Sequence, residues 1–138
     1  MQKTDYGPGA FAVDVMKAAL AGSNFRTALW TGRHLQLTLM TIPAGDDIGV
    51  ELHPTTDQIL LVAQGSGTAQ MGYRKEHLTW QQPIFCDSCV FVPAGTWHNI
   101  VNTGDKPLKL ISVYAPPNHA HGAIHQTKAI AEAEEHNH

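Results

Sequence analysis

Four side chains that can bind a metal lie in two short segments of this 138-residue sequence. Glu51 and His53 are two positions apart, so on an extended strand both side chains point to the same face. Gln58 follows after a turn, and His98 follows a Pro/Gly turn further along. A carboxylate and an imidazole placed together inside a β-structure are costly unless something binds them. Two imidazoles and one carboxylate are enough to hold a divalent metal with open positions.

Each of these residues also has an ordinary structural interpretation. A single histidine in a strand is most often a hydrogen-bonded structural residue. Glu51 can be solvent-exposed, and Gln58 can be a common polar strand residue. The specific spacing of the whole group is what favours a metal site over these interpretations.

The elements that must position these residues are short strands. Leucines at positions 35, 37 and 39 alternate with polar residues, which is the pattern of a half-buried strand. Turns rich in Pro, Gly and Asp separate such segments. We expect strands over residues 27–31, 35–42, 48–53, 58–63, 68–73, 78–81, 89–92, 97–102 and 108–114. Many short strands at near-regular spacing predict an all-β sandwich or barrel.

A short helix is expected toward each end of the chain. Residues 14–21 are good helix formers that end at Gly22, and residues 127–135 also favour a helix. No repeat or change of composition divides the sequence. We therefore expect one domain over residues 1–138, with its core barrel at about 27–115.

Composition excludes several classes of protein. Hydrophobic residues make up 43% of the chain and charged residues 15%, which argues against disorder. The net charge of -3 gives no electrostatic case for nucleic acid or an anionic membrane as a partner. Because we find neither a targeting segment nor a membrane-length apolar run, we expect a cytoplasmic protein. Cys86 and Cys89 are interpreted as reduced thiols, with a redox or metal role as the alternative.

The two segments together resemble a known family. Residues 45–65 resemble the first cupin motif, G-x5-HxH-x3,4-E-x6-G, and match its length at every step. The second cupin motif, G-x5-PxG-x2-H-x3-N, is matched at Pro93, Gly95, His98 and Asn102, with Asp87 in place of its first glycine. The chain is similar to small single-domain bacterial cupins labelled cupin type-2 or mannose-6-phosphate isomerase-like. The resemblance implies the cupin double-stranded β-helix, a jelly-roll barrel.

The resemblance also implies a ligand set that departs from the family pattern. Cupin metals usually sit between three histidines and one glutamate. Here a glutamate stands at the first histidine position and a glutamine at the glutamate position. The implied ligands are Glu51, His53, Gln58 and His98, and their formal charge stays at minus one. Such a set suits one divalent ion of Fe, Mn, Ni or Zn.

Further residues are assigned around the expected pocket. Asp57 and Asn102 are expected to orient the imidazoles. Arg26 and Arg33 are expected on the surface, with an inward arginine binding a substrate carboxylate or phosphate as the alternative. Histidines 119, 121 and 125 are also expected on the surface, the alternative being a lid over the barrel mouth. Candidates for the pocket lining, each of which can instead be plain core, are Met40, Met71, Tyr73, Phe91, Trp97 and Tyr114.

Two classes of function are compatible with these residues. The first is a metal-dependent enzyme of oxygenase, isomerase or lyase type that acts on a small organic molecule, with Glu51 or Gln58 as the proton-transfer group. The second is a non-catalytic cupin that binds a sugar or another small molecule. A homodimer is expected, because Val50, Leu52 and the N-terminal helix offer more apolar surface than a small barrel covers.

Overall fold

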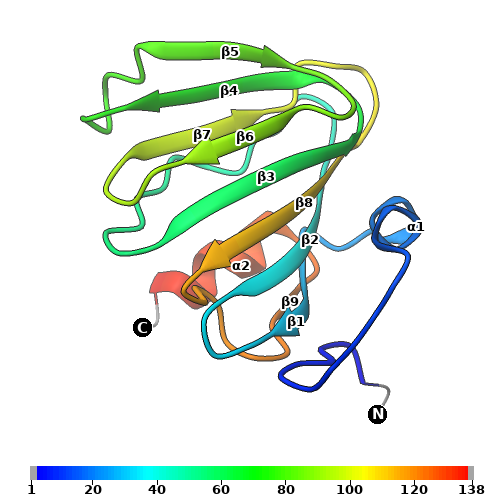
Figure 1. The fold of residues 1–138 in the computed structure, drawn as a ribbon. Helices are drawn as coiled ribbons and strands as arrows, with labels where there is room; N and C mark the ends of the chain where they lie inside the picture. Colours follow the sequence, from blue (N-terminus) through cyan, green and yellow to red (C-terminus); the bar gives the residue numbers. More distant parts are fainter. Residues whose placement is uncertain (1–2, 137–138) are drawn as a thin grey trace.

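The computed structural model describes residues 3–136 and consists mainly of two antiparallel sheets, with two short helices (Figure 1). The larger sheet has the strand order β6-β3-β8-β2-β1-β9, and the smaller has the order β5-β4-β7. The elements are α1 (Val15–Ala21), β1 (Arg26–Thr31), β2 (Gln36–Ile42), β3 (Asp57–Gln64), β4 (Gly67–Gly72), β5 (Trp80–Ile84), β6 (Cys89–Val92), β7 (Trp97–Val101), β8 (Leu108–Ala115), β9 (Ile124–His125) and α2 (Lys128–His136). The all-β prediction with two short helices is confirmed.

Two elements differ from the expectation. No regular strand forms over 48–53, and a single isolated bridge, between Glu51 and His98, lies within this segment. Gly49 lies in this segment with a φ of 99°, a conformation that interrupts a regular strand. The second difference is β9, a short strand that the alternation pattern did not reveal and that pairs with β1.

The inward face of the larger sheet changes from apolar to polar along its strands. In β8, Leu108 and Leu110 are followed on the same face by Ser112 and Tyr114, all buried. The same change occurs on the paired strands, where Thr38 lies opposite Ser112 in β2. Strand geometry puts alternate residues on one face, so the aligned registers gather buried polar side chains at one end of the interior. That end contains the candidate site.

The outer face of the larger sheet is covered in part by α1. Asp14 begins this helix by accepting a hydrogen bond from the Lys17 backbone N–H at 3.1 Å, a typical N-cap. Buried Ala19 packs with Leu39 and Ile111 of the sheet in a second apolar cluster. The helix therefore packs on the outer face of the sheet, opposite the inward face that carries the polar side chains.

The C-terminal segment folds against the barrel. In β9, His125 lies opposite Arg26 of β1, and Ala131 of α2 belongs to the main core with 3% of its surface exposed. Lys128 contacts the carboxylate of Asp47 and thereby links α2 to the loop before the candidate site. No helix of residues 3–136 is long and apolar enough to cross a membrane.

Candidate metal centre

Backbone hydrogen bonds join the two segments that carry the candidate ligands. The Glu51 N–H donates to the His98 oxygen at 2.9 Å, and the His98 N–H donates to the Glu51 oxygen at 3.0 Å. The Gly95 N–H donates to the His53 oxygen at 2.9 Å, from a turn in which Gly95 has a φ of 79°. A residue with a side chain rarely adopts this conformation. The two sequence motifs therefore meet through their backbones, and their side chains face each other.

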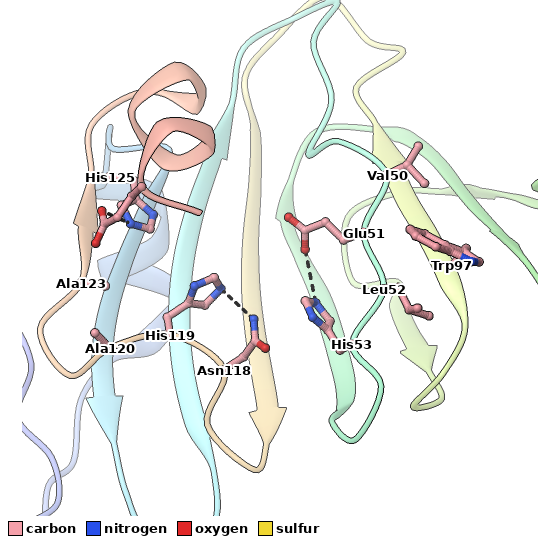
Figure 2. Close-up of a pocket in the computed structure, with 11 residues that line it drawn as sticks. Val50, Glu51, Leu52, His53, Trp97, Asn118, His119, Ala120, Ala123 and His125 are labelled. Atoms are coloured by element: carbon pink, nitrogen blue, oxygen red, sulfur yellow. Dashed lines mark hydrogen bonds and ion pairs between the residues drawn. The ribbon is translucent and has the colours of Figure 1, made fainter. Parts of the chain in front are cut away.

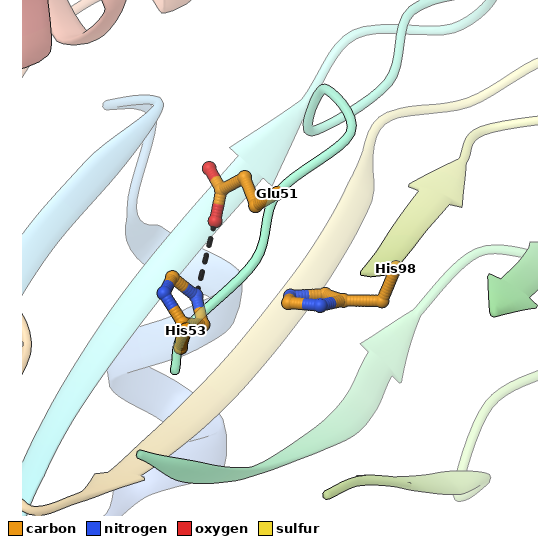
Figure 3. A group of neighbouring side chains, drawn as sticks. All are labelled: Glu51, His53 and His98. Atoms are coloured by element: carbon orange, nitrogen blue, oxygen red, sulfur yellow. Dashed lines mark ion pairs between the residues drawn. The ribbon is translucent and has the colours of Figure 1, made fainter. Parts of the chain in front are cut away.

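Glu51, His53 and His98 converge in the barrel interior, as Figure 3 shows. Their potential ligand atoms all lie within 4.8 Å of one another. The Oε2 atom of Glu51 lies 3.2 Å from Nε2 of His53, and the two imidazole centroids are 5.1 Å apart. The structure therefore brings together three of the four side chains that the sequence names as candidate ligands.

The charge states of the cluster suit a cation. Burial acts to raise the pKa of the Glu51 carboxyl, but the neighbouring His53 imidazole and the Arg26 guanidinium outweigh it, so the pKa is lowered. Burial lowers the pKa of His98, which favours its neutral form. An ionised carboxylate beside a neutral imidazole is the state in which both groups bind metals.

The tautomer of His98 is fixed by the backbone. Its Nδ1 atom lies 3.0 Å from the carbonyl oxygen of Thr96, and a carbonyl can only accept a hydrogen bond. Nδ1 therefore carries the proton, and Nε2 keeps its lone pair for another partner. A backbone carbonyl on the second ring nitrogen is a common arrangement for metal-binding histidines.

Gln58 is buried on β3 with 4% of its surface exposed. Its Nε2 donates to the Ser112 hydroxyl at 2.8 Å. Among the described residues, its Oε1 has no hydrogen-bond partner, and His53 Nε2 has the Glu51 carboxylate 3.2 Å away but no contact of hydrogen-bond geometry. Buried polar atoms are nearly always paired, so the unpaired amide oxygen of Gln58 in this polar interior fits a site built for a bound group. The donor set of this chain therefore fits a divalent metal.

Comparison with known proteins agrees with this geometry. A family model described as "Cupin domain" matches residues 38–114, which is more than half of the chain. This chain belongs to the cupin family.

Relatives of this cupin cover most of its length. It is 54% identical over 131 residues to the protein YrkC of Bacillus subtilis, covering 95% of this chain and 70% of YrkC. It is 33% identical over 115 residues to protein L612 of Acanthamoeba polyphaga mimivirus, covering 83% of this chain and 70% of L612. The crystal structure of BH2720 from Bacillus halodurans is similar with a TM-score of 0.93 and 53% identity, covering 95% of this chain and 99% of BH2720.

A cavity of about 650 Å³ lies beside the ligand cluster of the cupin. His119 and His125 line it together with Glu51 and His53, and Figure 2 shows the two pairs on segments facing each other. The expectation that His119 and His125 lie on the surface is wrong, because the C-terminal segment brings them over the barrel. His121 is exposed as expected and contacts the Gly7 carbonyl oxygen at 2.9 Å.

Arg26 is a functional candidate that the sequence interpretation placed wrongly. It was expected on the surface, but only 1% of it is exposed, and its Nη2 lies 3.8 Å from Oε1 of Glu51. Its Nη1 lies 3.1 Å from Nδ1 of His125. These partners are distant in sequence, so the local sequence around Arg26 showed only that it begins a strand and did not indicate burial. Arg33 is exposed, as predicted.

Two residues expected to orient the imidazoles have other partners. Asp57 accepts a hydrogen bond from the Ala94 backbone N–H at 2.9 Å. Asn102 donates hydrogen bonds to the carbonyl oxygens of Ile42 and Lys106 and thereby connects two segments of the backbone. Both residues hold turns of the cupin motifs, and among the described residues no hydrogen bond or ion pair joins either side chain to a candidate ligand.

The expected pocket lining is partly correct. Trp97 lines the cavity, and buried Tyr114 contacts the His53 ring with centroids 5.8 Å apart. Met40 and Met71 belong to the apolar core instead. The other two candidates, Tyr73 and Phe91, are 93% and 68% exposed and were assigned wrongly.

Proposed function

We propose that this cupin is a divalent-metal-dependent enzyme acting on a small organic molecule. The observation that carries the proposal is the convergence of Glu51, His53 and His98, whose ligand atoms lie within 4.8 Å of one another in a buried site. Gln58 is the proposed fourth ligand through its free Oε1. Two imidazoles, a carboxylate and an amide suit Fe, Mn, Ni or Zn, and the set lacks the thiolates typical of structural zinc sites.

The chemistry would be of oxygenase, isomerase or lyase type. When bound, the ion would supply Lewis-acid activation of a carbonyl or water, or oxygen chemistry if it is iron. The adjoining cavity of about 650 Å³ has the size of a small-molecule site. Its lining combines apolar Val50, Leu52 and Trp97 with polar Asn118 and His119, which would hold and orient the substrate.

Glu51 is the residue we propose for proton transfer. Its lowered pKa keeps the carboxylate ionised, and a carboxylate has one oxygen to bind an ion and another to accept a proton. Gln58 was an alternative for this role, but an amide does not titrate near neutral pH. Its proposed part is therefore to bind or orient through Oε1, with the amide fixed by Ser112.

Water access to the metal tests whether the cupin is an enzyme or a binding module. The protein would be loaded with Mn(II), and the relaxation rate of water protons would be compared with that of a His53→Ala/His98→Ala variant. An enzyme needs an open position, so we expect wild-type protein to enhance relaxation through exchanging water. Tightly bound Mn(II) without exchangeable water would contradict the enzyme proposal and favour a non-catalytic module.

A further inference from the structure

Arg26 brings a permanent positive charge into the interior of the barrel. It lies at the start of β1, and only 1% of its surface is exposed. Burying an ionised group is costly unless hydrogen bonds and an opposite charge compensate for it. The nearest carboxylate oxygen, Oε1 of Glu51, lies 3.8 Å from Nη2, which is too far for a hydrogen bond. The guanidinium is therefore only partly compensated.

One edge of this guanidinium is held and the other is free. Nη1 donates to Nδ1 of His125, because a guanidinium can only donate. The Nε2 atom of His125 lies 2.9 Å from Oε2 of Glu134, which anchors the imidazole to α2. Among the described residues, Nε and Nη2 of Arg26 have no hydrogen-bond partner. These two atoms form the edge of the planar group whose parallel N–H bonds match the two oxygens of a carboxylate.

The unpaired edge of Arg26 is buried beside the ligand cluster, because its Nη2 atom lies 3.8 Å from Oε1 of Glu51. Arg26 lines a cavity of about 450 Å³ that shares Val50 and Glu51 with the larger cavity. His119, which lines the larger cavity, is neutral at physiological pH, because burial, with Arg26 and His125 adding to it, lowers its pKa to about 2. Arg26 is thus a source of fixed positive charge beside Glu51.

We propose that the free edge of Arg26 is an anion subsite that holds the carboxylate of the substrate, so that the substrate is a small organic acid. This inference rests on the proposed function, because Glu51 must be engaged by the metal for Arg26 to need a second anion. A bidentate contact would orient the acid against the ligand cluster, and it would compensate the buried guanidinium. A neutral carboxamide offers one acceptor oxygen and one NH2 donor, so it leaves one N–H group of Arg26 facing another donor and binds more weakly.

NMR of the arginine side chains tests this subsite in the full chain loaded with diamagnetic Zn(II). The chain contains three arginines, and the Nε–H signal of Arg26 can be assigned with Arg33→Lys and Arg74→Lys variants at two exposed positions. The probes are malonate and malonamide, which have similar size but differ in charge. Methyl phosphate is the third probe and represents a phosphate ligand.

We expect malonate to shift the Arg26 signal in a saturable way and malonamide to leave it unchanged. An Arg26→Gln variant should bind malonate about tenfold more weakly or worse, because a charge-assisted bidentate contact is lost. Wild-type protein that binds zinc and malonate with a silent Arg26 signal would overturn the subsite and leave the metal proposal standing. A tighter response to methyl phosphate than to malonate would overturn the carboxylate assignment. Wild-type protein that binds none of Zn(II), Mn(II), Ni(II) and Fe(II) would refute the metal proposal itself, and with it this inference.

Discussion

Gln58 donates a hydrogen bond of 2.8 Å from its Nε2 to the hydroxyl of Ser112, and this contact orients the amide. The nitrogen end is thereby occupied, and the oxygen end is left as a buried acceptor without a partner among the described residues. Ser112 belongs to the polar end of the inward face of β8, one position along that face from Tyr114. The pair therefore presents a candidate oxygen ligand at the position where the family pattern has a carboxylate.

Gln58→Leu should weaken metal binding by roughly 10- to 100-fold, because it removes this oxygen and leaves Ser112 unpaired. Gln58→Glu should restore or strengthen binding, because a second carboxylate adds charge to the site. Affinities measured by competition with a metal-sensitive dye would check both, with Gln64→Leu on the same strand as the control. Equal affinities for wild type and Gln58→Leu would show that Gln58 is not a ligand.

Because of Asp5, the free energy of unfolding should decrease at acid pH. Burial acts to raise its pKa, but hydrogen bonds from the Thr31 hydroxyl and the Gly122 and Gly7 N–H groups prevail, so the pKa is below 3.8. A lowered pKa stabilises the fold above the unfolded value, and this stabilisation is lost as the pH falls through the folded value. Asp5→Asn should destabilise by about 2 kcal/mol at pH 7.

The same substitution should destabilise the protein progressively less as the pH falls below 3.8, because the carboxyl of the unfolded chain takes up its proton first and the folded carboxyl only below its lowered pKa. Urea denaturation at pH 7 and near pH 3 would measure both differences, with exposed Asp105→Asn as the control. A cost that does not change between the two pH values would contradict this account of Asp5.

The packing of α2 predicts that the C-terminal segment contributes to stability. Ala131→Asp should destabilise the protein by about 3 kcal/mol, because Ala131 lies in the main core and a buried aspartate would have no partner there. Ala133→Asp, at an exposed position of the same helix, should change stability by no more than about 0.5 kcal/mol. Thermal or urea unfolding of both variants checks this, and equal effects would mean that α2 does not hold the barrel.

The dimer prediction keeps only part of its original basis. Val50 and Leu52 line the cavity and are half-buried, so they do not form the external surface that the sequence suggested. The N-terminal helix does expose an apolar side chain, Leu20 at 47%, and Phe91 of β6 is a further one at 68%. Sedimentation equilibrium at micromolar concentration should give about twice the chain mass of 15.0 kDa. A single species at the chain mass would contradict the dimer.

Local sequence patterns predict the short strands and the grouping of Glu51, His53 and His98, and the family resemblance adds the cupin barrel. Alternation and turn residues mark most strands, because they reflect backbone geometry over a few residues. Glu51 and His53 lie together although no regular strand forms over 48–53. Extended backbone puts residues two apart on one side whether or not a full ladder forms.

The surroundings of the site depended on long-range contacts and could not be predicted in this way. Arg26 is a charged residue at the start of a strand, and the local sequence of such a position predicts an exposed side chain. Its partner His125 is 99 positions away and reaches it only because β9 pairs with β1. His119 reaches the cavity for the same reason, since a histidine-rich segment after two prolines has no local pattern that shows where it folds back.

Metal content measured by elemental mass spectrometry on untagged, full-length protein tests the central claim most directly. Wild type would be compared with His53→Ala/His98→Ala and with the control His34→Ala/His77→Ala, whose histidines are exposed. The account predicts close to one divalent ion per chain in wild type and control, and its loss in the first variant. Equal metal in all three proteins, or none in any, would contradict a metal centre at Glu51, His53 and His98.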